Sequence, residues 1–296
     1  MADRQLVYLA HGSDSAAMEA KYSIVSAMAH ATSELGVTVF TDRPAAFDKF
    51  PIRAEPLSAA TFDEWTGPDK FVMRAKIFAL MGAIDRAAKT LFMDADTLFL
   101  GAPETLFARI GRGRSVMHAD EGALFDNPAQ VAMTQWLLGY FPDRKIEMPD
   151  GSEVALKNDA RFWIAGVLGL DRSDKHLIEH TLALSDAVWA KSKWHLAEQF
   201  AFGITLGGSN RVNVADDVVH HYWNRVGTPG WQGGRSVRQL QNEQAARFFA
   251  AHAGGGFDVM VADYRARPAT IYRLGKLARL RGAAIRRVRA LTGRRA

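Results

Sequence analysis

The chain has 296 residues, of which 48% are hydrophobic, and it has no cysteine. This length allows one large α/β domain or two small ones with a substantial core. The lack of cysteine excludes a disulfide scaffold and a thiolate metal site and fits a reducing compartment. No basic stretch followed by a long apolar one opens the sequence, and no apolar run approaches the roughly 18 residues of a membrane span. We therefore expect a cytoplasmic protein.

Charge is distributed unevenly along the chain. The 37 Lys and Arg and 32 Asp and Glu residues give a formal net charge of +5. Eleven of the basic residues and none of the acidic ones lie from Tyr264 onward, which leaves 26 basic against 32 acidic residues before it. The sequence thus predicts an acidic body with a basic tail.

Strand-like and helical segments alternate in the first half. Strands are predicted at residues 6–10, 37–40 and 90–93, and helices at residues 16–35, with Gly36 as the terminator, and 71–88. Such strand–helix–strand repeats predict an α/β fold with a mixed, mostly parallel sheet and helices on its faces.

The second half is less regular. It predicts strands at 115–118, 162–170, 212–214 and 218–223, and helices at 131–140, 176–189 and 197–206. A polar loop or hairpin is expected at 142–157, and a glycine-rich loop at 227–234.

Polar residues follow three of the strands in the first half: Ala10-His11-Gly12, Thr41-Asp42 and Asp94-Ala95-Asp96. Ligands of parallel α/β sheets bind beyond the carboxyl ends of the strands. Asp94 and Asp96 are two residues apart and can aim two oxygens at one hard cation such as Mg²⁺ or Mn²⁺. The alternative is a pair of solvated carboxylates in a turn.

These residues together resemble the GT-A fold glycosyltransferases, and within them glycosyltransferase family 8. The resemblance rests on the DxD motif at Asp94 and Asp96, the strand end at Thr41-Asp42-Arg43-Pro44, Arg74-Ala75-Lys76 and His221-Tyr222. It covers residues 5–225. It implies a Rossmann-like nucleotide-diphospho-sugar transferase fold, with a catalytic domain at 1–245 and a C-terminal extension at 246–296.

The resemblance implies a retaining hexosyl transfer from a nucleotide sugar, by default a UDP-sugar, to a glycan or glycolipid acceptor. Asp94, Asp96 and His221 would bind Mn²⁺ or Mg²⁺, with His220 as the rival of His221. The remaining implied roles are donor binding by Ala10, His11, Asp42, Arg74 and Asp94, and catalysis by Glu198 and Gln199 at the sugar.

Several of these positions have a simpler structural interpretation. Asp42 can cap a turn, Glu198 can favour the positive end of a helix dipole, and Arg74 can form a surface salt bridge. The chain also departs from the family pattern. His11 stands where an acid is common, Ile164-Ala165 lacks the usual polar residue, and no lysine matches the diphosphate clamp, for which Arg225, Arg235 or the backbone of 227–234 could substitute.

The tail predicts a basic amphipathic helix, interrupted near Gly275 and Gly282. Its apolar residues recur at helical spacing: Ile271, Leu274, Leu277, Ala278, Ala284, Ile285, Val288 and Leu291. We expect residues 268–296 to bind an anionic membrane surface, peripherally on the inner face of the cell membrane. Packing on the acidic body or on a partner is the alternative, and nucleic-acid binding is not expected because interleaved aromatic residues are lacking.

Two other functions compete with glycosyl transfer. A haloacid-dehalogenase-like phosphohydrolase also carries a carboxylate pair after an apolar strand, and Lys193 with Asp216-Asp217 could imitate its later motifs. That pattern wants Thr or Val four residues after Asp94, where this chain has Leu98. The third hypothesis is a non-catalytic sugar-nucleotide binding protein on the same fold.

Overall fold

The computed structural model describes residues 2–125, 131–141, 143–223 and 236–267. Within them, seven strands form one mixed sheet in the order β10-β6-β9-β4-β1-β2-β3. The strands are β1 (Ala2–Ala10), β2 (Gly36–Thr41), β3 (Arg53–Pro56), β4 (Ala87–Met93), β6 (Arg114–Ala123), β9 (Arg161–Asp171) and β10 (Arg211–Val214). Only β9 runs antiparallel to its neighbours, β4 and β6. The sheet is therefore mostly parallel, as predicted.

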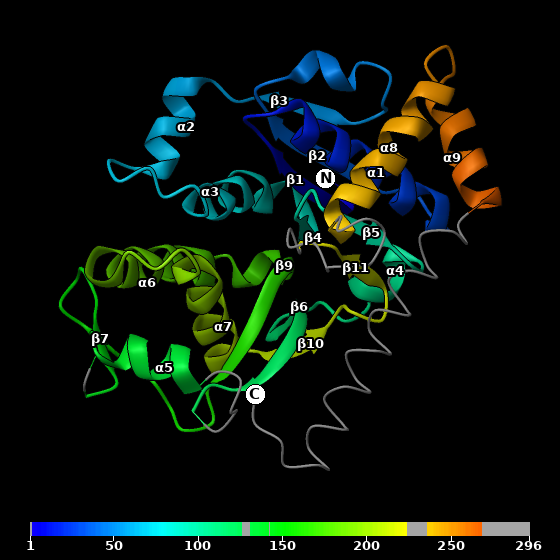
Figure 1. Cartoon of the computed structure of the whole chain (residues 1–296). Helices are drawn as coiled ribbons and strands as arrows, with labels where there is room; N and C mark the ends of the chain where they lie inside the picture. The colour runs from blue at the N-terminus through cyan, green and yellow to red at the C-terminus, as the bar shows by residue number, and fades with distance from the viewer. Residues whose placement is uncertain (1, 126–130, 142, 224–235, 268–296) are drawn as a thin grey trace, which may run out of the picture.

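Helices cover both faces of this sheet, which confirms the predicted α/β class (Figure 1). One face carries α1 (Asp14–His30), α4 (Pro103–Phe107), α8 (Val237–Ala251) and α9 (Phe257–Ala266). The other carries α3 (Arg74–Ala83), α6 (His176–Ser192) and α7 (Ala197–Ser209). Side chains alternate along β1, with Leu6 and Tyr8 in the first core and Val7 in the second.

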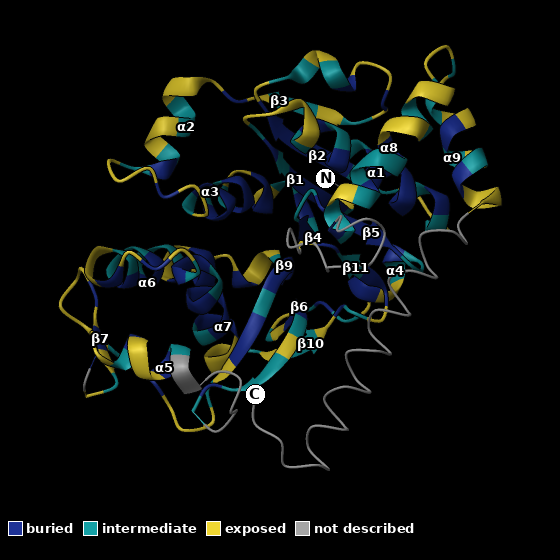
Figure 2. Cartoon of the chain, in the orientation of Figure 1, coloured by how far each residue is buried: buried dark blue, intermediate teal, exposed yellow. Residues whose placement is uncertain are grey.

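Smaller elements complete the described chain. They are the helices α2 (Ala59–Thr66) and α5 (Val131–Leu138), short 3₁₀ turns such as Pro44–Phe47 and Arg172–Asp174, and two pairs of short strands. These pairs are β5 (Thr97–Phe99) with β11 (Val219–His221) and β7 (Lys145–Glu147) with β8 (Glu153–Ala155). The β7–β8 pair is the hairpin expected within residues 142–157. Figure 2 shows that the central strands and the helix faces against them are buried.

The first helix ends five residues before its predicted end. The sequence pattern indicated a helix over 16–35, but α1 stops at His30 and Gly36 already belongs to β2. The Glu104 carboxylate accepts hydrogen bonds of 2.9 Å from the backbone N–H groups of both Thr32 and Ser33. A residue more than seventy positions away thus holds residues 32 and 33 in a non-helical conformation. Local periodicity in the sequence does not reveal such a contact.

The second long helix is also shorter than predicted. Residues 71–88 were expected to be one helix, but α3 covers Arg74–Ala83, a short 3₁₀ turn follows at Ile84–Arg86, and β4 begins at Ala87. The pairing of β4 with β1 starts at Ala87 and draws these residues into the sheet.

The described part of the expected C-terminal extension packs on the face of the sheet that carries α1. The expected division between residues 245 and 246 falls inside α8. Both α8 and α9 pack on α1, and Ala245, Met260 and Tyr264 belong to the core on that face of the sheet. The tail at 268–296 and the glycine-rich loop at 227–234 lie outside the described residues.

Candidate metal and donor site

The three polar strand ends lie at one edge of the sheet, as expected. The parallel strands β2, β1 and β4 are neighbours, so their carboxyl ends meet there. Both carboxylate oxygens of Asp42 accept from the backbone N–H of Gly12 at 3.3 Å, which joins the ends of β2 and β1. The His11 ring stacks on Phe62 of α2, with centroids 3.6 Å apart.

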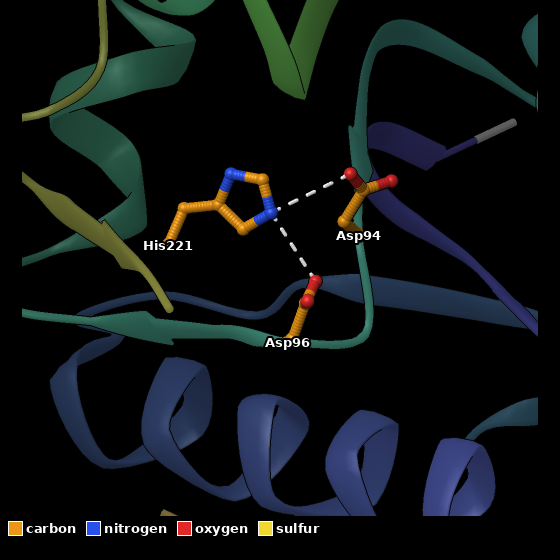
Figure 3. A group of neighbouring side chains, drawn as sticks. All are labelled: Asp94, Asp96 and His221. Atoms are coloured by element: carbon orange, nitrogen blue, oxygen red, sulfur yellow. Dashed lines mark ion pairs between the residues drawn. The ribbon is translucent and has the colours of Figure 1, made fainter. Parts of the chain in front are cut away.

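Asp94, Asp96 and His221 converge at this edge (Figure 3). His221 Nε2 lies 3.2 Å from Asp96 Oδ1 and 3.7 Å from Asp94 Oδ2. The antiparallel pairing of β11 with β5 aligns His221 with Thr97, one residue after Asp96. A short two-stranded sheet thereby carries a residue from far along the sequence to the carboxylate pair.

The residues of this triad fit a divalent cation. One potential ligand atom from each residue lies within 4.8 Å of the other two, and no other such group of His, Asp and Glu occurs in the described residues. The Nε2 atom of His221 faces the carboxylates, whereas its Nδ1 atom is buried without a hydrogen-bond partner. Two carboxylate oxygens and one imidazole nitrogen are a donor set that suits Mn²⁺ and, less well, Mg²⁺. His220 is not in this group.

Two basic side chains brace the carboxylates. Lys76 Nζ of α3 lies 2.9 Å from Asp94 Oδ1, and Arg238 Nη1 of α8 lies 2.6 Å from Asp96 Oδ2. Burial alone would raise the pKa of Asp96, but the neighbouring His221 and Arg238 outweigh it and lower that pKa to about 2. Asp96 is therefore a carboxylate at neutral pH and available as a ligand.

Glu198 and Gln199 enter the site from the first turn of α7. Glu198 is 2% exposed, and its Oε1 lies 3.2 Å from Lys76 Nζ. Burial raises the pKa of Glu198 to about 7, although the Lys76 ammonium opposes this shift. The amide oxygen of Gln199 faces the backbone N–H of Ala165 at 3.5 Å.

A cavity of 750 Å³ unites these groups. Its wall includes the metal triad, Glu198 and Gln199, together with His11, Phe62, Val72, Met73 and Trp223. This volume falls in the range of ligand-binding pockets. The cavity thus offers a charged floor beside an apolar wall.

Arg74, expected at the donor, points elsewhere. Its guanidinium forms two hydrogen bonds with Asp186, at 2.7 and 2.9 Å, and donates to the carbonyls of Glu64 and Trp65. Arg74 and Lys76 are two residues apart on α3 and so face different ways. The structure brings Lys76, rather than Arg74, to the carboxylates, because this face of α3 packs on the sheet.

Two further charged residues at the site escaped the sequence analysis. Glu19 of α1 and Arg238 of α8 both line the cavity. Glu19 lies one turn before Tyr22 and Ser23 on the buried face of its helix, so an acid on an apolar helical face was the available signal. Arg238 had none, since it lies beyond the predicted glycine-rich loop.

The residues that could imitate a phosphohydrolase do not reach the site. Lys193 pairs with Asp69, and Asp217 forms two hydrogen bonds with Arg109. Neither residue lines the cavity above Asp94 and Asp96. The geometry therefore does not favour that alternative.

No helix in the described part of the chain is long and apolar enough to cross a membrane. No family model and no curated protein matches the sequence. Among solved structures, the chain is similar to the apo structure of WbbM, a bifunctional glycosyltransferase, at 14% sequence identity and a TM-score of 0.48. The match covers 83% of this chain and 44% of that chain, so this chain spans less than half of that structure's length.

Proposed function

We propose that the chain is a metal-dependent glycosyltransferase of the GT-A type, akin to glycosyltransferase family 8, that transfers a hexose from a nucleotide sugar. The observation that carries this proposal is the convergence of Asp94, Asp96 and His221 on the floor of the cavity that Glu198 and Gln199 also line. A UDP-sugar is the proposed donor, and a glycan or glycolipid is the proposed acceptor.

Asp94, Asp96 and His221 would hold Mn²⁺ or Mg²⁺. Such a cation, when bound, supplies Lewis-acid stabilisation of the charge that develops on a leaving diphosphate. Lys76 and Arg238 brace the carboxylates so that their oxygens stay directed at His221. This preorganisation means that the ligands need little rearrangement when the site is loaded.

Glu198 and Gln199 are proposed to face the transferred sugar. Retaining transfer requires a nucleophile or an electrostatic stabiliser of the oxocarbenium-like state on the far face of the ring. The buried Glu198, held by Lys76, is suited to electrostatic stabilisation, and the Gln199 amide can stabilise by its dipole. Ala10, His11 and Asp42, at the ends of β1 and β2, remain the proposed contacts of the nucleoside.

The proposal is tested with a panel of nucleotide sugars, with and without Mn²⁺. A bound donor should raise the melting temperature by mass action, and only when the metal is present. Asp96→Asn should abolish this stabilisation and any donor hydrolysis or transfer. Asp85→Asn, at a carboxylate that is 64% exposed, is the matched control and should behave as wild type. Metal-independent turnover, or full activity of Asp96→Asn, would overturn the assignment.

Residues 268–296 are proposed to bind anionic membranes through their basic amphipathic pattern. Removal of these residues should abolish sedimentation with liposomes that contain phosphatidylserine, while neutral liposomes bind neither form. Unchanged binding of the truncated chain would contradict this part of the proposal.

A further inference from the structure

The buried Glu19 and the half-buried Arg238 form an ion pair beside the proposed metal centre. Glu19 is fully buried, and its two carboxylate oxygens accept from Arg238 Nε at 2.8 Å and Nη2 at 2.6 Å. Asn242 of α8 donates a third hydrogen bond of 2.8 Å to Glu19 Oε1. Two of the three guanidinium nitrogens are thus fixed in one plane by a carboxylate that cannot move into solvent.

The third nitrogen of that guanidinium is directed at Asp96. Arg238 Nη1 donates to Asp96 Oδ2 at 2.6 Å, whereas Asp96 Oδ1 is the oxygen that faces His221. The Asp96 side chain is only 9% exposed, so water cannot readily replace Arg238 as its hydrogen-bond donor. One oxygen of Asp96 is therefore occupied and the other is left for a cation.

Stability alone does not account for this arrangement, since ion pairs away from solvent often contribute no more than well-packed apolar side chains would. Its specific effect is on the ligand geometry of Asp96. Ca²⁺ takes about six to eight oxygen ligands and often binds both oxygens of a carboxylate, whereas Mg²⁺ and similar small cations accept single oxygens in octahedral geometry.

We propose that Glu19 and Arg238 are positioning residues that restrict Asp96 to one coordinating oxygen and thereby make the site select a small octahedral cation over Ca²⁺. The inference rests on the metal centre of the proposed function. It assigns to α1 and α8 a role in cation selectivity that the Asp94-Ala95-Asp96 motif alone does not have.

The test compares Mn²⁺ and Ca²⁺ binding to the full chain by calorimetry, with competition between the two ions. The variant Glu19→Gln with Arg238→Met removes one negative and one positive charge, so the summed charge at the site is unchanged while Asp96 Oδ2 is freed. The ratio of Mn²⁺ to Ca²⁺ affinity should fall by about tenfold, which is at the lower end of the effect that loss of a ligand's hydrogen-bond partner has on metal affinity. A general loss of structure would lower the affinities for Mn²⁺ and Ca²⁺ alike and leave their ratio unchanged.

Two further variants sharpen the test. Arg109→Met with Asp217→Asn removes an ion pair outside the cavity, with hydrogen bonds of 2.7 and 2.6 Å, and should keep the wild-type ratio. Arg238→Lys keeps the positive charge beside the buried Glu19 carboxylate. A single ammonium cannot reproduce the hydrogen bonds that the guanidinium makes with both Glu19 and Asp96. The ratio of Mn²⁺ to Ca²⁺ affinity of this variant should therefore lie between those of the wild type and the double variant.

An unchanged ratio in both Arg238 variants, with Mn²⁺ still bound at wild-type affinity, would overturn the selectivity role and leave the metal centre intact. Absence of Mn²⁺ binding to the wild-type chain would overturn the selectivity role and the metal-dependent function together.

Discussion

The imidazole of His221 lies so close to the backbone of Gly166 that a Cβ at position 166 would stand 2.3 Å from Nδ1. Gly166 is in the middle of β9, where an extended backbone accepts any residue, so only the missing side chain matters. We expect Gly166→Ala to displace the ring and lower Mn²⁺ affinity by about 10–100-fold, measured by calorimetry. Gly208→Ala, whose Cβ would meet nothing within 4 Å, is the control. Equal Mn²⁺ affinity in the two variants would show that the ring is not a ligand.

The two adjacent histidines of β11 should differ in their effect on the metal. His221→Ala removes the imidazole between Asp94 and Asp96, and Mn²⁺ affinity should fall by at least about tenfold. His220→Ala should leave Mn²⁺ affinity unchanged, because successive side chains of a strand point to opposite faces. Electron paramagnetic resonance of free Mn²⁺ measures both values, and the reverse result would transfer the ligand role to His220.

Lys76 should contribute to stability far more than an exposed lysine does. Lys76→Met leaves the carboxylates of Asp94 and Glu198 without their shared counter-charge, and the free energy of unfolding at pH 8 should fall by about 3–5 kcal/mol. Lys175→Met breaks an exposed pair with Asp85 and should cost about 0–1 kcal/mol. Urea unfolding monitored by circular dichroism gives both numbers, and similar losses would contradict the buried ion-pair network.

Glu198 should make stability depend on pH. Its pKa is about 7 in the fold and 4.5 in the reference state, so the folded protein binds the proton more tightly. The stabilisation that this tighter proton binding provides is fully present below pH 4.5 and is lost as the pH rises through 7. Relative to Glu198→Gln, the wild type should therefore lose up to about 3 kcal/mol of unfolding free energy across this window.

Urea titrations at pH 4.5, 6 and 7.5 check this dependence on pH. Glu147→Gln, at a side chain that is 72% exposed, should differ from the wild type by the same free energy of unfolding at all three pH values. If the difference in unfolding free energy between Glu198→Gln and the wild type were also independent of pH, the buried carboxyl of Glu198 would keep an ordinary pKa.

Features that depend on neighbouring residues could be predicted from the sequence. The alternation of apolar segments gave the α/β class and most strands, and the two-residue spacing placed Asp94 and Asp96 on one side of the chain after β4. The parallel neighbours β2, β1 and β4 then brought the predicted strand ends to one edge. Local periodicity and chain geometry suffice for these features because they act over a few residues.

Features that depend on contacts between distant residues could not be predicted from the sequence. The early end of α1 at His30 follows from Glu104, the choice of Lys76 over Arg74 from the face of α3 that packs on the sheet, and the place of His221 from the pairing of β11 with β5. The contact of Arg238 with Asp96 spans 142 positions. Such contacts are set by the packing of whole elements, and no local pattern in the sequence encodes which side chains that packing brings together.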